Sequence, residues 1–164
     1  MKPEANQSVR RVDQNELRTN QAFVIMMLVS AYIFDDWRMV AIQSGFFLLT
    51  TISLWLGPYV LIYRLLLKPL GIIKPDVRVD NPEPHRFATS VGFVVSGLAA
   101  YFLFNGATVV GWALAWLIVV LAGLAFAGWC AGCFSYYMLN RLGIGGFFHH
   151  GTVAEGFPGA RPPR

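Results

Sequence analysis

Two cysteines, Cys130 and Cys133, form a Cys-x-x-Cys pair that could carry thiol–disulfide chemistry. On one helix, a spacing of three places both sulfurs on one face, with Cα atoms about 5 to 6 Å apart, which a disulfide accepts. Phe134 follows the pair, so the histidine required for covalent haem attachment is absent. A four-thiolate zinc site would need ligands from elsewhere, and cysteines also suit tight helix packing. We favour packing, keep both cysteines as redox candidates, and predict no metal site and no other catalytic residues.

The cysteines lie near the end of an internal repeat, whose copies cover residues 12–72 and 79–144. Each copy opens with Val-Asp, runs through two apolar segments and closes with Leu-Gly-Ile. In the first copy, Gly57 and Pro58 break the second helix. We expect the second copy to continue as one helix through Trp129 and the cysteines.

The composition indicates an integral membrane protein. Of the 164 residues, 55% are hydrophobic and 13% charged, against roughly 25% charged in soluble domains. A membrane-spanning helix needs about 20 mostly apolar residues, and four segments approach that length: 19–34, 37–56, 87–104 and 109–128. We predict an all-α fold with four transmembrane helices, arranged as two repeated hairpins with an interfacial helix between them.

Five regions follow from this pattern. Residues 1–18 form an N-terminal segment, in which Asp13 is available to cap a helix that begins near Val12. Residues 19–72 form the first hairpin and the interfacial helix, and 87–144 form the second hairpin. Between them, three prolines predict an extended linker over 73–86, and residues 145–164 form a tail rich in glycine and proline.

Basic residues predict the orientation. Lysines and arginines precede the first apolar segment, fill the central connection and follow the last segment, whereas the two hairpin tips are nearly bare. Both termini should therefore face the cytoplasm of a prokaryotic cell, across its inner membrane. Arg64 and Lys68 share one face of the interfacial helix, where anionic lipid headgroups would attract them. No aromatic residues interleave with a basic stripe, so we expect no nucleic-acid partner.

Several functions are disfavoured because ionisable residues are missing from the apolar segments. No Asp, Glu, Lys, Arg or His occurs between Phe87 and Met138, although such residues mark proton and ion pathways. His85, His149 and His150 lie outside the spans, so a membrane-buried haem is also disfavoured. We predict no cofactor, while a groove between the hairpins remains compatible with a lipid or a quinone.

Small residues on the last apolar helix predict close helix packing. They recur mostly at multiples of four, the pattern that lets two helix backbones approach each other. The residues are Gly111, Ala115, Gly123, Ala127 and Ala131.

Three motifs carry a resemblance to a known family. They are the entry at Asp80, Pro82, Pro84, Arg86 and Phe87, the break at Gly57, Pro58 and Tyr59, and the Gly-aromatic-Cys-x-Gly-Cys sequence ending at Cys133. Together they resemble the prokaryotic membrane-protein family of domain of unknown function 4395, over roughly residues 12–144. The resemblance implies a small bacterial inner-membrane protein with no established activity, in a family with some members linked to thioredoxin-like or rhodanese-like proteins. The first entry departs from the pattern, because Arg18 is followed by Thr19.

Two functions fit these observations. The first, which we favour from the sequence, is a non-catalytic scaffold or accessory subunit that packs against other integral membrane subunits of an energy-converting or transport complex. The second is a membrane thiol–disulfide redox protein, in which Cys130 and Cys133 exchange with a cytoplasmic thioredoxin-like partner.

Overall fold

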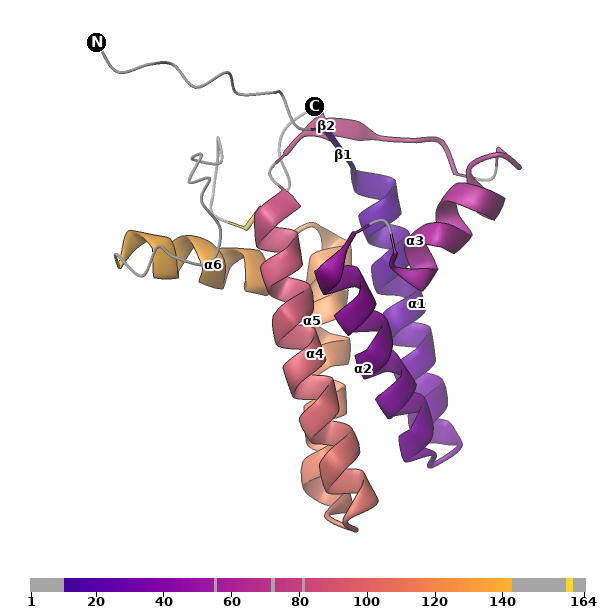
Figure 1. The fold of residues 1–164 in the computed structure, drawn as a ribbon, viewed down its shortest axis with the longest axis vertical. Helices are drawn as coiled ribbons and strands as arrows, with labels where there is room; N and C mark the ends of the chain where they lie inside the picture. Colours follow the sequence, from indigo (N-terminus) through magenta and orange to yellow (C-terminus); the bar gives the residue numbers. More distant parts are fainter. Residues whose placement is uncertain (1–10, 55, 72, 81, 143–158, 161–164) are drawn as a thin grey trace.

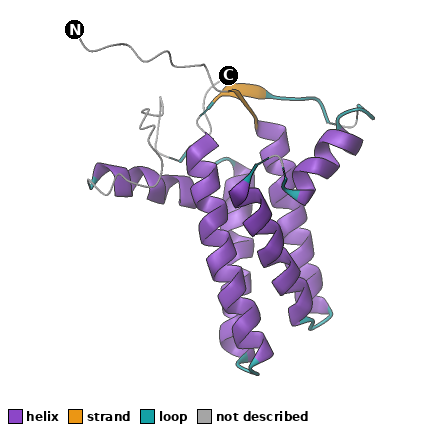
Figure 2. Ribbon diagram, in the orientation of Figure 1, coloured by secondary structure: helices purple, strands orange, loops and turns teal. Residues whose placement is uncertain are grey.

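The computed structural model describes residues 11–54, 56–71, 73–80, 82–142 and 159–160, and these are mostly helical (Figure 2). The elements in chain order are β1 (Arg11–Asp13), α1 (Gln14–Ile33), α2 (Trp37–Ile52), α3 (Pro58–Ile62), the π-helix η1 (Tyr63–Leu67), β2 (Val77–Val79), α4 (Pro82–Phe104), α5 (Thr108–Ala127) and α6 (Ala131–Arg141).

Four long helices form two hairpins that lie side by side (Figure 1). Helices α1 and α2 make one hairpin and α4 and α5 the other, and both hairpin tips lie at the same end of the molecule. The short elements β1, β2, α3 and α6 all gather at the opposite end, where α6 runs across the direction of the bundle (Figure 1). The predicted pair of hairpins is therefore present, and one end of the bundle carries most of the irregular structure.

Helices α4 and α5 are long and apolar enough to cross a membrane, with mean hydropathies of 1.8 and 2.4. Among the described helices, α1 and α2 do not reach this standard. Helix α2 has only 16 residues, and α1 opens with a polar stretch from Gln14 to Asn20. Two of the four predicted spans are thus supported by length and composition.

The two hairpins are joined by apolar packing and by polar contacts between α2 and α4. Leu28 and Val40 are fully buried in the core. The hydroxyl of Ser44 donates to the carbonyl of Phe93 at 3.1 Å. At the C-terminal end of α2, the Arg86 guanidinium donates to the carbonyl of Thr51 at 3.0 Å. This hydrogen bond satisfies one of the last carbonyl groups of the helix, which have no partner within the helix.

The openings of the two repeat copies pair with each other. Strands β1 and β2 form an antiparallel ladder in which Val12 lies opposite Arg78. Asp13 then caps α1, as predicted, by accepting a hydrogen bond from the backbone N–H of Asn15 at 3.0 Å. The sequence analysis did not predict this ladder, because three-residue strands carry too little periodicity to be recognised.

The predicted extended linker over 73–86 is wrong at its end, because α4 begins at Pro82 rather than at Phe87. Proline lacks only an N–H that the first turn of a helix leaves unpaired, so Pro82 and Pro84 are both accepted there. This extra turn places His85 on a helix instead of in a loop.

A short helix is present between the two hairpins, as predicted, and consists of α3 and η1 at the end of the bundle that carries β1 and β2 (Figure 1). Its Arg64 forms a bidentate ion pair with Glu16 of α1, at 2.8 and 3.0 Å. Lys68, by contrast, is exposed.

Candidate functional site

The cysteine pair lies at a break between two helices, and the expected continuous helix through Trp129 is wrong. Helix α5 ends at Ala127, and Gly128 adopts the left-handed conformation with φ of 116°. The N–H of Trp129 then returns to the carbonyl of Leu124 at 3.0 Å. This is a common way to end a helix, and glycine adopts its left-handed position at little cost.

Helix α6 begins directly at the cysteines. Cys130 is the N-cap residue of α6, and its sulfur accepts a hydrogen bond from the backbone N–H of Cys133 at 3.1 Å. The two residues form a disulfide with a Cα–Cα separation of 5.2 Å, within the predicted range. One sulfur therefore lies at the positive end of a helix, where backbone N–H groups favour negative charge.

The two sulfurs differ in exposure. Cys133 is buried, with 3% of its surface exposed, whereas Cys130 is only partly buried. A reagent or partner approaching from outside the protein would therefore meet Cys130 first.

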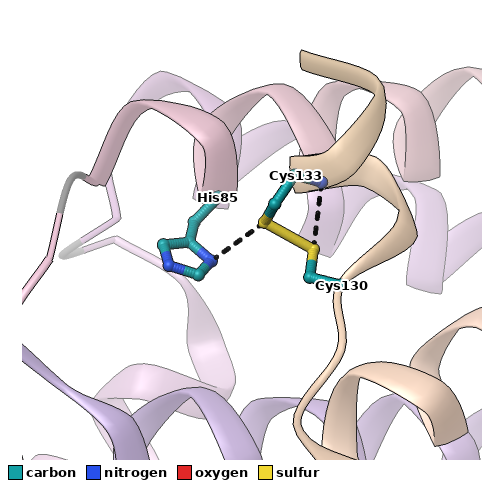
Figure 3. Close-up of side chains that lie close together, drawn as sticks. All are labelled: His85, Cys130 and Cys133. Carbon is teal, nitrogen blue, oxygen red and sulfur yellow. Dashed lines mark hydrogen bonds between the residues drawn. A yellow bond between two sulfur atoms is a disulfide. The ribbon is translucent and has the colours of Figure 1, made fainter. Parts of the chain in front are cut away.

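His85, in the first turn of α4, faces the disulfide (Figure 3). Its Nδ1 atom lies 3.5 Å from the sulfur of Cys133, and its Nε2 atom lies 3.1 Å from a carboxylate oxygen of Asp80. A carboxylate only accepts hydrogen bonds, so Nε2 carries a proton. In the neutral ring, Nδ1 is then an unprotonated acceptor that faces the sulfur.

Asp80 is fixed in turn by the start of α1. The side-chain amide of Gln14 donates to the same Asp80 oxygen at 3.0 Å, and Gln14 is 4% exposed.

Burial, with a smaller contribution from the Asp80 carboxylate, raises the pKa of the Tyr137 phenol to about 12. Tyr137 is therefore a neutral phenol at physiological pH, and the base that adjoins the disulfide is His85.

A second contact anchors α6 to α4. The hydroxyl of Tyr136, which is buried, donates to a carboxylate oxygen of Glu83 at 3.2 Å. Glu83 and His85 belong to the same helical turn, so one short segment of α4 both holds α6 and presents the imidazole to the sulfurs. The relative positions of His85 and Cys133 are thus set by packed helices rather than by a loop.

A segment of the tail, Gly159 and Ala160, lies against the cysteines. The N–H of Cys130 donates to the carbonyl of Gly159 at 2.8 Å, and Ala160 pairs with Trp129 in an antiparallel bridge. Gly159 has a φ of 80°, and an added Cβ would lie 2.7 Å from the carbonyl oxygen of Cys130. We call these two residues the strap, because they pair with the backbone of Trp129 and Cys130, beside the more accessible sulfur.

Gly159→Ala is expected to loosen the strap and to raise the reaction rate of Cys130 in the reduced protein by about 3- to 10-fold, since protein thiol reactivity depends on access. The rate of alkylation by a maleimide, followed by mass spectrometry, measures this. Gly106→Ala is the matched control, because Gly106 has a φ of 81° with no atom near the added Cβ. Equal rates in both variants would show that the strap does not limit access.

The small residues predicted for helix packing are in different environments. Gly111 and Ala115 are buried within the protein, and an added Cβ on Gly111 would meet the side chain of Leu103 on α4. Gly123 and Ala131 are partly buried, and Ala127 is exposed. Gly111 therefore packs closely against α4 of the same chain, and Ala115 is also buried inside it.

Of the predicted site residues, the structure brings Cys130 and Cys133 together. It adds His85, Asp80 and Gln14, which the sequence analysis did not assign to a site. His149, His150 and most of the predicted tail lie outside the described residues. The sequence carries one signal for His85 that we did not use: it follows Asp80 closely, as part of the family-like entry motif.

The site also has the donor set of a transition-metal centre, although the sequence predicted none. Within the described residues, His85, Cys130 and Cys133 each offer one ligand atom, and these three atoms lie within 4.8 Å of one another. Thiolate and imidazole are the ligands that zinc prefers. The arrangement can thus support disulfide exchange in one state and metal binding in another.

Comparison with known proteins identifies a family whose function is unknown. Neither curated proteins nor solved structures yield a match to this chain. The family model described as "Domain of unknown function (DUF4395)" matches residues 12–141. This match covers both hairpins, His85 and both cysteines, in agreement with the resemblance drawn from the sequence motifs. The chain therefore belongs to the DUF4395 family.

Proposed function

We propose that this protein carries out thiol–disulfide exchange with a cysteine pair of a partner protein, through Cys130 and Cys133. The observation that carries the proposal is the chain of contacts from Asp80 through His85 to Cys133, beside a disulfide that caps a helix. An imidazole held by a carboxylate and directed at a sulfur is the arrangement that activates a thiol for proton transfer.

In the oxidised protein, the accessible sulfur is the point of attack. A thiolate of the partner attacks Cys130, the bond between Cys130 and Cys133 breaks, and its electron pair leaves on Cys133. Cys133 takes up a proton from solvent, relayed by Nδ1 of His85. The partner's second thiolate then attacks the partner sulfur of the mixed disulfide and expels Cys130 as a thiolate. Two electrons therefore pass from the partner to this protein, and the protons that the partner's thiols release to solvent balance those that the two cysteines take up.

The reverse reaction uses the same groups. The thiolate of Cys130, stabilised by the N–H of Cys133, attacks a disulfide of the partner and releases one partner thiolate. Cys133 then gives its proton to Nδ1 of His85 and attacks Cys130, which reforms the internal disulfide and releases the second thiolate. The reduction potentials of the two proteins decide the net direction.

The partner is a thioredoxin-like protein in this proposal, because such proteins present a cysteine pair at a surface and react through mixed disulfides. The strap supports a particular docking geometry. The carbonyl of Gly159 accepts a hydrogen bond from the N–H of Cys130. An extended segment of the partner would accept the same hydrogen bond while the partner's sulfur approaches Cys130. The strap would then leave when the partner binds.

We further propose that α1, α2, α4 and α5 all span the membrane. Support comes from the two hairpins lying side by side with their tips at the same end (Figure 1) and from exposed apolar side chains on α1 and α2, such as Met26, Ile42 and Leu49. The distribution of basic residues supports a cytoplasmic location for the cysteine end. Disulfides are rare in the cytoplasm except where they are catalytic or redox-sensing, which favours exchange over a structural role.

The scaffold function predicted from the sequence remains a prediction. The small-residue stripe is one of the features that support it, and burial of Gly111 and Ala115 inside this chain leaves fewer small residues for other subunits. We therefore place redox exchange first. A lipid or quinone in an apolar groove between the hairpins also remains a prediction. The structure has an open apolar depression lined by Phe23, Met26 and Tyr59.

Thiol trapping in native membranes tests the proposed function. Membrane vesicles of known orientation are treated with an oxidant or a reductant, washed free of it and labelled while intact with a membrane-impermeant maleimide. We expect Cys130 to be labelled only after reduction, and only where the cytoplasmic face is accessible. Cysteines that remain unlabelled on both faces under both conditions would overturn the proposal.

A further inference from the structure

We propose that the reduced protein binds one Zn²⁺ ion through the sulfurs of Cys130 and Cys133 and Nδ1 of His85. This inference uses the residues of the proposed redox centre but does not depend on exchange with a partner. It requires only that the disulfide is reduced, since binding removes one proton from each thiol and leaves two thiolates as ligands.

The spacing of the three ligand atoms fits a tetrahedral ion. Zinc bonds to sulfur at about 2.3 Å and to histidine nitrogen at about 2.0 Å, so neighbouring ligand atoms lie about 3.5 to 3.8 Å apart. Nδ1 of His85 is already 3.5 Å from the sulfur of Cys133. Once the disulfide opens, a small rotation of the Cys130 side chain would complete this spacing, because all three atoms start within 4.8 Å of one another.

The surroundings of the three ligands are those of a metal centre. In a histidine ligand, the N–H of the second ring nitrogen usually donates a hydrogen bond to a carboxylate or another acceptor, which fixes the ring and increases its basicity. Here Nε2 of His85 lies 3.1 Å from Asp80, and Gln14 holds the same carboxylate oxygen. The backbone N–H of Cys133 donates to the sulfur of Cys130 and would stabilise it as a thiolate ligand.

The donor set also selects the class of metal. Two thiolates and one imidazole favour zinc over calcium or magnesium, which prefer oxygen ligands. Three protein ligands leave the fourth position of a tetrahedral zinc ion to water or to an external ligand. This position lies on the side of Cys130, since Cys133 is buried and Cys130 is only partly so.

Zinc binding and disulfide formation exclude each other, because both need the same two sulfurs. A zinc-bound protein would be protected from oxidation, and an oxidised protein would hold no zinc at this site. The metal would therefore act as a lock on the reduced state.

The test uses the full chain, purified in detergent and reduced with a phosphine, which does not compete for zinc as a thiol reductant does. Competition with a chelating dye measures zinc affinity and stoichiometry, and Co²⁺ serves as a spectroscopic probe of tetrahedral thiolate coordination. We expect one zinc ion per reduced chain, none at this site in the oxidised chain, and intense cobalt absorption.

Variants distinguish the residues that would bind zinc directly from the carboxylate that orients His85. His85→Ala and Cys130→Ser are each expected to weaken zinc binding by at least 100-fold, whereas Asp80→Asn should weaken it by about 10- to 100-fold. The exposed Ser135→Ala is the matched control on α6 and should bind as wild type. The oxidised wild-type chain provides a comparison that does not depend on how well any variant folds.

Zinc binding by the reduced wild-type chain that is no stronger than that of the oxidised chain would overturn the inference. So would a His85→Ala variant with wild-type affinity and an unchanged cobalt spectrum. If zinc binds but the thiol-trapping experiment fails, the redox proposal falls and the metal site stands. If trapping succeeds and zinc does not bind, only the metal site falls.

Discussion

A Cys133→Ser variant is expected to hold a stable mixed disulfide on Cys130, whereas Cys130→Ser is expected to form almost none. The reduced variants are incubated with oxidised glutathione, and the adduct is quantified by intact mass. Cys130 reacts because its sulfur is accessible and caps α6, and in Cys133→Ser the thiol that would release the adduct is gone. The difference in adduct between the two variants should be at least about tenfold, since thiolate character and access govern this reaction.

The same samples provide the control. After denaturation in SDS, both variants should react with a maleimide to the same extent, which shows that each retains one free thiol. An equal yield of adduct from both folded variants, or a larger yield from Cys130→Ser, would contradict the assignment of Cys130 as the attacking sulfur.

His85→Ala is expected to slow the resolving step by about 10²- to 10³-fold at neutral pH, the usual contribution of a positioned general base. The step is the attack of Cys133 on a preformed adduct of Cys130, followed as glutathione release in a stopped-flow or quenched-flow experiment. Formation of the adduct should change much less, because His85 faces Cys133 and the helix N-terminus stabilises Cys130.

Two controls separate proton transfer from a general loss of structure. The deficit of His85→Ala should shrink as the pH rises, because the Cys133 thiol then loses its proton to solvent without a base. Asp80→Asn keeps the shape of the side chain and should give a smaller deficit, since it only orients the imidazole. A His85→Ala deficit that is constant across pH, with equal slowing of both steps, would indicate a structural role instead.

Much of the helical architecture could be predicted because it depends on local signals. The two hairpins were predicted from apolar segments that are nearly long enough to span a membrane. The N-cap of α1 was predicted correctly from Asp13. The two copies of the repeat are also more alike than predicted, since a short helix follows the second apolar helix in both copies, α3 in one and α6 in the other.

The break at Gly128 was missed because its context resembles a membrane helix. Glycine occurs there in a run of small and apolar residues, where it usually serves close packing. Only the backbone shows that Gly128 is left-handed and that Cys130 starts a new helix. This changes the chemistry, because a sulfur at a helix N-terminus is stabilised as a thiolate and a sulfur on the side of a helix is not.

His85 could not be assigned to the cysteines from one sequence. It precedes Cys133 by 48 positions, and no local pattern links residues on different helices at that distance. The prolines beside it also favoured a loop, although the first turn of a helix accepts them. The packing of α6 against α4, fixed in part by Tyr136 and Glu83, is what brings the imidazole to the sulfur.

The midpoint potential of the Cys130–Cys133 couple in native membranes tests the proposed redox function most directly. Vesicles are equilibrated in a series of dithiol–disulfide buffers, and the reduced fraction is measured by acid quenching and maleimide mass shift. Because the helix N-terminus stabilises a thiolate of the reduced form, we predict a reversible two-electron transition above about −300 mV, the level below which structural disulfides usually lie. A pair that resists reduction until well below that potential, or that never forms the disulfide, would contradict a redox function.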